Sequence, residues 1–213
     1  SVFGVKDAYL NSDADFHTTV SKMADIPRDQ AKTINLGLFY GMGKAKLQAE
    51  LGVSKEKAEE LFAQYHAKVP FVKQLMKSVS NRAQQRGQIR TLLGRLCRFH
   101  LWEPNRFGIN KALPFEQAVQ EHGQGNIRRA YTYKALNKLI QGSAADMTKK
   151  SMLDLYKEGI IAHIQIHDEL DLSVESPEQA KKVVEIMENA VKLDVPNKVD
   201  YESGKNWGDI YDK

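Results

Sequence analysis

The sequence predicts an α+β fold in which helices dominate and a small antiparallel sheet lies near the C-terminus. Through most of the first 156 residues, apolar side chains recur at helical spacing, and glycine or proline separates one such segment from the next. The pattern changes after Gly159. Two short runs, Ile160–Ile166 and Leu170–Val174, then flank His167-Asp168-Glu169, which predicts a β-hairpin with charged residues at its turn.

The first three predicted helices have recognisable ends. Pro27 begins the first helix, which continues to the glycines of Gly41-Met42-Gly43. Ser54 caps a second helix, and Pro70 begins a third that ends at Gly87.

The next segment is less regular. Residues 89–115 show no clear pattern, so no element is predicted there. A long helix is expected over about 117–134, broken and then resumed to Tyr156. A last helix begins at Ser176-Pro177, where proline suits the first helical position and Gln179 completes a capping box.

Composition excludes several classes of protein. With 213 residues, of which 42% are hydrophobic, the chain can form a substantial core and is not a disordered tail. The single cysteine, Cys97, argues against a disulfide framework and favours a reducing, cytoplasmic setting. No apolar run is long enough to cross a membrane, and no secretory signal opens the chain. Because the first residue is Ser1, we expect a processed product or a piece of a longer protein.

Charge is distributed unevenly, although the net charge is only +4. Residues 1–150 contain 24 Lys and Arg against 13 Asp and Glu, whereas residues 151–213 contain 7 against 14. The stretch 71–102 carries seven cations and no acid, which is typical of a surface that binds a polyanion such as nucleic acid. A solvated helix face is the alternative. The cations expected on DNA phosphates include Arg82, Arg86 and Arg90.

Four residues of the first predicted helix lie four apart and therefore share one slowly drifting face: Arg28, Lys32, Leu36 and Tyr40. Two cations near a helix N-terminus are repelled by the positive end of the helix dipole, which destabilises the helix. The same positions are favourable for binding phosphate groups. Tyr40 adds a flat aromatic surface at the far end. An ordinary amphipathic helix with a basic edge is the alternative for Arg28 and Lys32.

The adjacent carboxylates Asp168 and Glu169 repel each other and would gain nothing from an exposed turn. At the end of two apolar strands they suit a divalent cation such as Mg²⁺, which takes oxygen ligands and shares them with substrate phosphates. On this tripeptide alone, an acidic turn without a metal is the alternative.

Asn137 and Gln141 are four residues apart on a predicted helix, so their amides point the same way. Amides placed in this way can read base edges or sugars in a minor groove. They can equally be polar groups that face water.

Together these stretches resemble the DNA polymerases of family A, and the resemblance spans nearly the whole chain in order. The segment from Arg28 to Gly41 is similar to that family's nucleotide-binding helix, and Gln165–Leu170 is similar to its metal-binding palm motif. Leu139–Asp146 resembles the helix that lies along primer and template. The ending Gly204–Gly208 resembles the family's C-terminus.

The resemblance implies roles around an incoming nucleotide. Arg28 would hold its outer phosphates, and Lys32 would act in catalysis by neutralising the transferring phosphate and protonating the departing pyrophosphate. His17, the last residue of Asp15-Phe16-His17, would contact a phosphate. Tyr40 would lie near the templating base. Leu36 would face the sugar, at a position where the family usually has Phe or Tyr.

The resemblance also implies catalysis by two Mg²⁺ ions. Asp168 would be a catalytic ligand shared by both ions, Glu169 a supporting carboxylate and metal ligand, and His167 a neighbour of the primer end. Asn137 and Gln141 would contact DNA. The implied partners are primer–template DNA, a dNTP and the N-terminal remainder of the polymerase, with no membrane.

Two further departures from the family affect the expected activity. The family's other essential aspartate would lie upstream of Ser1, as would the thumb and half of the palm, so we expect the isolated chain to be inactive. Tyr133 stands where the family usually has an arginine, and the adjacent Lys134 is the nearest cation that could replace it.

The sequence therefore predicts a template-directed DNA polymerase, with fingers in residues 1–115 and part of the palm in residues 116–213, acting in a bacterial cytoplasm or a phage-infected host. A single-subunit phage-type RNA polymerase is the alternative enzyme, against which Glu169 and the stretch 141–146 argue. A DNA-binding remnant without activity is the third reading. The presence together of Arg28, Lys32 and Asp168 argues against it.

Overall fold

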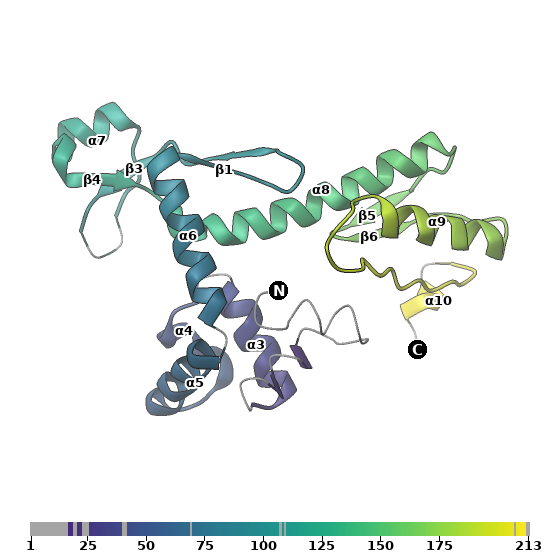
Figure 1. Ribbon diagram of the computed structural model, residues 1–213, viewed down its shortest axis with the longest axis horizontal. Helices are drawn as coiled ribbons and strands as arrows, with labels where there is room; N and C mark the ends of the chain where they lie inside the picture. Colours follow the sequence, from purple (N-terminus) through teal and green to yellow (C-terminus); the bar gives the residue numbers. More distant parts are fainter. Residues whose placement is uncertain are drawn as a thin grey trace. The chain divides into compact units, whose positions relative to one another are not determined.

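The computed structural model (Figure 1) describes residues 17–18, 21–22, 26–39, 42–68, 70–106, 108, 110–206 and 208–211. The chain divides into two compact units, Ser1–Ser143 and Ala144–Lys213, and each is described by itself. The boundary lies inside a long helix, α8 (Ala135–Lys157), whose first turns belong to the first unit. Within the described residues, no helix is long and apolar enough to cross a membrane.

The first unit begins with helices that share one core: α3 (Arg28–Phe39), α4 (Lys44–Leu51), α5 (Lys55–Lys68) and α6 (Pro70–Arg86). Apolar side chains at helical spacing fill this core, among them Ile34 of α3, Leu47 of α4 and Tyr65 of α5. The predicted cap of α5 is confirmed, because Ser54 Oγ accepts the Lys57 N–H at 3.2 Å. Helix α4 has no counterpart among the predicted helices.

Helix α6 also joins a second core, which it forms with a β-hairpin and the first turns of α8. It begins at Pro70, as predicted, and ends before Gly87, whose φ of 67° lies in the left-handed region that glycine adopts without strain. Buried side chains of this core include Ile89 and Leu136. The hairpin pairs two strands of residues 88–98 in antiparallel register, β1 (Gln88–Arg90) and β2 (Leu96–Arg98).

The segment between the hairpin and α8 is less helical than the sequence predicts. The helix expected over 117–134 is wrong beyond His122, because α7 (Phe115–His122) ends at Gly123, where φ is 80°. Gly123 and Gly125 disfavour helix, and pairing with a distant strand then decides the conformation of 127–129. The elements that follow α7 are the 3₁₀ turn η1 (Gln124–Asn126), strand β4 (Ile127–Arg129), which pairs with β3 (Trp102–Pro104), and the 3₁₀ turn η2 (Thr132–Lys134).

The second unit packs the remainder of α8, a hairpin and a helix around the buried residues Leu155, Ile160 and Val183. The predicted hairpin is confirmed, although both strands are shorter than the apolar runs that predict them. Its strands and the last helices of the unit are β5 (Ile164–Ile166), β6 (Glu169–Asp171), α9 (Pro177–Asn189) and α10 (Gly208–Tyr211).

The start of α9 shows the predicted cap with one shift. Ser176 Oγ accepts the Gln179 N–H at 3.2 Å, as a capping serine should. The Gln179 Oε1, however, accepts the N–H of Glu175 rather than that of Ser176. The reciprocal half of the capping box is therefore displaced by one residue.

The predicted fold class is confirmed, since helices dominate and the described sheets are small, antiparallel and two-stranded. The β5–β6 sheet lies in the C-terminal region where a sheet is predicted. The β1–β2 and β3–β4 sheets lie within residues 88–129, where the sequence gives no strand pattern.

Candidate nucleotide-binding helix and acidic hairpin

Helix α3 presents Arg28 and Lys32 on an exposed face. Ala31 and Ile34 set this orientation, because both are fully buried in the first core and lie on another face of the helix. The Arg28 Nε donates a hydrogen bond to Thr18 Oγ1 at 3.2 Å. The two predicted cations therefore share one face near the helix N-terminus, where the helix dipole attracts anions.

His17 is held beside this helix by Asn35. Asn35 is only 1% exposed, and its Nδ2 lies 3.3 Å from His17 Nδ1. Because Asn35 follows Arg28 by nearly two turns, the two side chains project to the same side of α3. Asn35 Oδ1 is buried without a hydrogen-bond partner among the described residues, which is unusual for a buried amide oxygen. Asn35 is not among the predicted site residues, although its spacing from Arg28 is a signal for such a role.

Some predicted residues lie outside the described part of the chain. Tyr40 is one of them, together with Asp15 and Phe16 beside His17. The side chain of Leu36 is also not described. Their roles stay predictions.

The turn between β5 and β6 presents Asp168 and Glu169. Ile166 pairs with Glu169, so only His167 and Asp168 connect the two strands. His167 has a φ of 53°, in the left-handed region that residues other than glycine rarely adopt, and its backbone O accepts Gln165 Nε2 at 3.1 Å. His167, Asp168 and Glu169 are all exposed. The tight turn thus puts both predicted metal ligands at the end of the hairpin.

A third carboxylate, that of Asp171, lies two residues after Glu169 and therefore on the same face of β6. Burial, together with the negative charge of Glu169, raises the pKa of Asp171 above its usual value. Its Oδ2 is buried without a hydrogen-bond partner in the described part of the chain. Asp171 is not among the predicted site residues, although the two-residue alternation of a strand is a signal for it.

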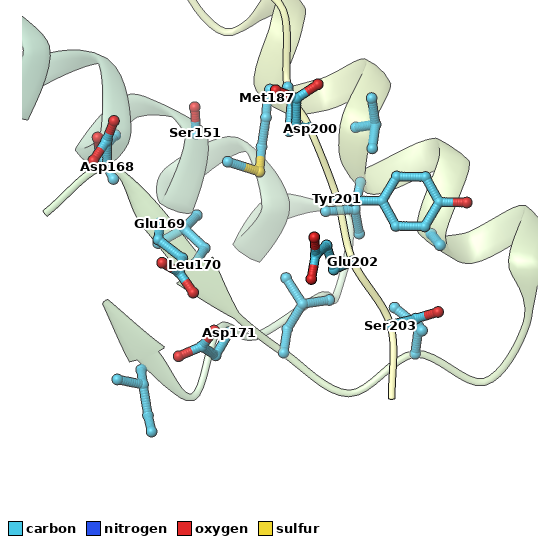
Figure 2. A pocket seen from close by; sticks show the side chains of 18 of the residues that line it. Ser151, Asp168, Glu169, Leu170, Asp171, Met187, Asp200, Tyr201, Glu202 and Ser203 are labelled. Carbon is cyan, nitrogen blue, oxygen red and sulfur yellow. The ribbon is translucent and has the colours of Figure 1, made fainter. Parts of the chain in front are cut away.

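These carboxylates line an open cavity of about 1250 Å³ in the second unit (Figure 2). Its other walls come from α8, α9 and residues 197–206. Figure 2 shows the segment Asp200–Ser203 across the cavity from Glu169 and Asp171. Asp200 and Glu202 of this segment add two carboxylates, so acids outnumber the basic residues of the lining.

The hairpin does not by itself complete a metal site. The described residues hold no group of three or more His, Cys, Asp or Glu that could bind a metal ion. Asp168 and Glu169 offer the carboxylate oxygens that Mg²⁺ prefers, and both lie at an exposed turn where a bound ion could also take oxygen ligands from a substrate. They fit Mg²⁺ as part of a ligand set.

Asn137 and Gln141 lie one turn apart on α8, in the first unit. Asn137 is half-buried and Gln141 is exposed. Arg82 and Arg86 are exposed on α6, also one turn apart, and α6 packs against the start of α8 through the second core. The structure therefore brings these four predicted DNA contacts onto two helices that pack together.

The loop of the β1–β2 hairpin docks on α8 next to Gln141, and Figure 1 shows this hairpin running alongside the helix. Leu92 N–H donates to Ser143 Oγ at 3.0 Å, and Arg95 Nη2 donates to the Gly142 O at 2.8 Å. The fifth predicted DNA contact of the first unit, Arg90, donates its Nη1 to a carbonyl within this loop. Arg95 is one of the seven cations of the stretch 71–102, and its bond to α8 is not visible in the sequence because its partner is far away in the chain.

Paired cations on a helix suit phosphate groups, and paired carboxylates at a turn suit the metal ions that assist phosphoryl transfer. Residues 6–209 match the profile of DNA polymerase family A, and the chain belongs to this family. It is 33% identical to a DNA-directed DNA polymerase of Pseudomonas phage M6, over 98% of this chain and 33% of that protein. It is 36% identical to DNA polymerase I of Geobacillus stearothermophilus, over 91% of this chain and 21% of that protein.

A solved structure gives the same result. The POL domain of Pol1 from M. smegmatis, in complex with DNA primer-template and dNTP, superposes with a TM-score of 0.69 and 27% identity. The match covers 91% of this chain and 34% of that one. The chain thus spans only about a fifth to a third of the length of these relatives.

Proposed function

We propose that this chain supplies the nucleotide-binding part and one metal-binding motif of a template-directed DNA polymerase, which transfers a nucleotidyl group from a dNTP to a primer 3′ end. The observation that carries the proposal is the exposed pair Arg28 and Lys32 on α3, beside His17, in a member of DNA polymerase family A. A phage and a bacterium among the relatives support a site of action in a bacterial cytoplasm or a phage-infected host.

The basic face of α3 suits a triphosphate, because phosphoryl transfer depends mainly on positioning and on neutralising charge. Arg28, at the helix start, holds the outer phosphates. Lys32, one turn deeper, neutralises the transferring phosphate and donates a proton to the departing pyrophosphate. His17, which Asn35 holds in place, adds a phosphate contact.

The same helical spacing extends the site toward the rest of the nucleotide. Leu36 faces the sugar, and Tyr40 lies near the templating base. Asn137 and Gln141 contact the minor groove of the primer–template duplex, and His167 lies near the primer end. The remaining affinity comes from cations on DNA phosphates, among them Arg82, Arg86 and Arg90.

Asp168 and Glu169 would hold Mg²⁺, with Asp168 as the principal ligand and Glu169 as a supporting carboxylate. Bound Mg²⁺ would lower the pKa of the attacking primer hydroxyl and neutralise charge on the phosphate. Two ions need more ligands than one hairpin offers. We therefore propose that a further carboxylate comes from outside the described residues, in the N-terminal remainder of the polymerase.

This assignment gives each part of the chain a place in a right-hand polymerase. Residues 1–115 act as fingers, which bind the nucleotide, and residues 116–213 act as part of the palm. The chain alone is then inactive, because its hairpin provides carboxylates from only one of the two metal-binding segments.

Primer extension tests the proposal. A labelled primer annealed to a longer template is incubated with Mg²⁺ and either dNTPs or NTPs, with the 213-residue chain alone or joined to a family A segment that carries the other palm carboxylate. We expect extension only by the joined protein and only with dNTPs. Asp168→Asn should abolish extension while DNA binding is retained, and Glu185→Gln, an exposed acid of α9, is the matched control that should keep both.

The outcomes separate the parts of the proposal. No extension by the joined protein would refute the polymerase assignment, and a preference for NTPs would favour an RNA polymerase. Extension by the chain alone would refute the need for an outside carboxylate. An active Asp168→Asn variant would refute the metal assignment.

A further inference from the structure

We infer that Tyr131, Tyr133 and Lys134 form a phosphate-binding element that contacts the sugar–phosphate backbone of DNA. The inference rests on the proposed function and adds to it a site that the mechanism does not use.

The ammonium group of Lys134 lies beside two aromatic rings at once. Its Nζ is 5.3 Å from the centroid of the Tyr131 ring and 5.6 Å from that of the Tyr133 ring. Both distances are within the range of about 6 Å in which a ring face attracts a cation. The rings restrict the flexible lysine to one region while some of its N–H groups stay available to an anion.

The local backbone explains how these residues meet. Lys134 N–H donates to the Tyr131 O at 3.0 Å and closes the 3₁₀ turn η2, in which residues three apart lie above one another. Tyr131 has a φ of 62°, in the left-handed region that a tyrosine seldom adopts. The turn packs against α6, which supports this unusual conformation.

The element is exposed, and the part of the chain that the structure describes gives it no acidic partner. The tyrosine rings are large, yet Tyr131 is 40% and Tyr133 60% exposed, and Lys134 is exposed as well. The sequence has no Asp or Glu between Glu121 and Asp146. Among the described residues, no ion pair involves Lys134. Its charge is therefore available to an anion from outside the chain.

The surroundings indicate a polymer of phosphates rather than a single anion. Lys138, one turn further along α8, is exposed, and so are Arg82 and Arg86 on the helix against which η2 packs. A row of cations without acids matches a nucleic-acid backbone, where each neutralised phosphate releases counterions. Exposed tyrosines next to such cations suit contact with the sugars between phosphates.

The test measures binding of the full 213-residue chain to primer–template DNA by fluorescence anisotropy, from about 50 to 200 mM salt. Each phosphate contact contributes about 0.9 to the slope of log affinity against log salt concentration. We expect Lys134→Gln to lower the magnitude of the slope by about that amount. Lys134→Arg should restore it, and Lys55→Gln, an exposed lysine next to Glu56 on α5, should leave it unchanged.

The tyrosines are tested with variants that keep the backbone and the charge. Tyr133→Leu removes one ring, and Tyr131→Asn removes the other while keeping a residue that tolerates the left-handed conformation. Each should weaken binding about two- to five-fold without changing the slope, because the lysine keeps its charge but loses a ring that orients it. Thermal unfolding followed by circular dichroism checks that each variant is folded.

A slope for Lys134→Gln equal to that of the wild type would overturn the inference while the proposed function stands. Tyrosine variants that weaken binding only to an unpaired overhang would also overturn it, since they would indicate stacking on bases. Failure of the wild-type chain to bind any DNA would instead count against the proposed function, and the phosphate site would fall with it.

Discussion

Replacing Gly142 with alanine is expected to destabilise the first unit, although alanine is the better helix former. A Cβ at this position in α8 would lie 2.9 Å from Thr91 Cγ2 and 3.4 Å from Arg95 Nη2. The end of the arginine can shift, but the Thr91 methyl group cannot do so easily. Thr91 is buried, and its Oγ1 accepts the Arg95 N–H at 3.0 Å, which fixes the side-chain rotamer.

The expected size follows from the ways in which this contact can be relieved. Rotating Thr91 gives up its hydrogen bond, which is worth about 1 kcal/mol. Lifting the loop from α8 instead breaks the bonds from Leu92 N–H to Ser143 Oγ and from Arg95 to the Gly142 O. Overpacking of this kind costs roughly 1–3 kcal/mol. The higher helix propensity of alanine offsets about 1 kcal/mol, so a net loss of about 1 kcal/mol is expected.

A double-mutant cycle in urea measures this coupling between Gly142 and Thr91. Thr91→Ser keeps the hydroxyl group and removes the methyl group that meets the new Cβ. In the Thr91→Ser background, Gly142→Ala should therefore raise the free energy of unfolding by about 1 kcal/mol instead of lowering it. Equal effects of Gly142→Ala in both backgrounds would show that the loop and the helix do not meet as described.

Three other changes test the helical core and the basic face of α3. Tyr65→Phe should raise the free energy of unfolding by about 1 kcal/mol in urea, because the Tyr65 hydroxyl is buried without a partner among the described residues; a loss would reveal a missed hydrogen bond. Burial, and then the nearby Lys73, lower the pKa of His66, so the unfolded chain binds a proton more readily. Stability should thus fall as the pH drops from about 6.5 toward the folded-state pKa, and urea titrations from pH 8 to 5 should show a smaller fall for His66→Gln. In single-turnover incorporation by the joined polymerase, Lys32→Ala should slow the chemical step more than Arg28→Ala, which should mainly weaken dNTP binding, and a reversed order would exchange the two roles.

The elements that the sequence predicts well are those whose ends are set locally. Pro70, Gly87 and the serine caps act through their own backbone and the next few residues, so they are visible without the fold. The helix expected over 117–134 fails because residues 127–129 pair with a strand more than twenty positions earlier. Such pairing overrides helical periodicity. A strand of only three residues is too short to show a recognisable alternation of apolar and polar residues in the sequence.

The candidate site divides in the same way. Arg28, Lys32, Asp168 and Glu169 are predicted because each lies in a short continuous segment that resembles a motif of family A. Asn35 is missed because its importance lies in a contact with His17, eighteen residues before it. Arg95 and Thr91 are missed for the same reason, since their partner Gly142 is about fifty residues away and belongs to another element.

The basic face of α3 and the acidic turn of the β5–β6 hairpin each have a feature that lowers the stability of the free chain. On α3, Arg28 and Lys32 bring positive charge to the helix end that already carries a positive partial charge. At the hairpin, Asp168 and Glu169 repel each other next to His167, whose left-handed backbone is itself unfavourable. Each arrangement opposes folding locally, and each would be relieved by a ligand of the opposite charge, an anion at the helix and a cation at the hairpin. Repelling or strained groups of this kind are expected at functional sites, where a bound ligand offsets the local loss of stability.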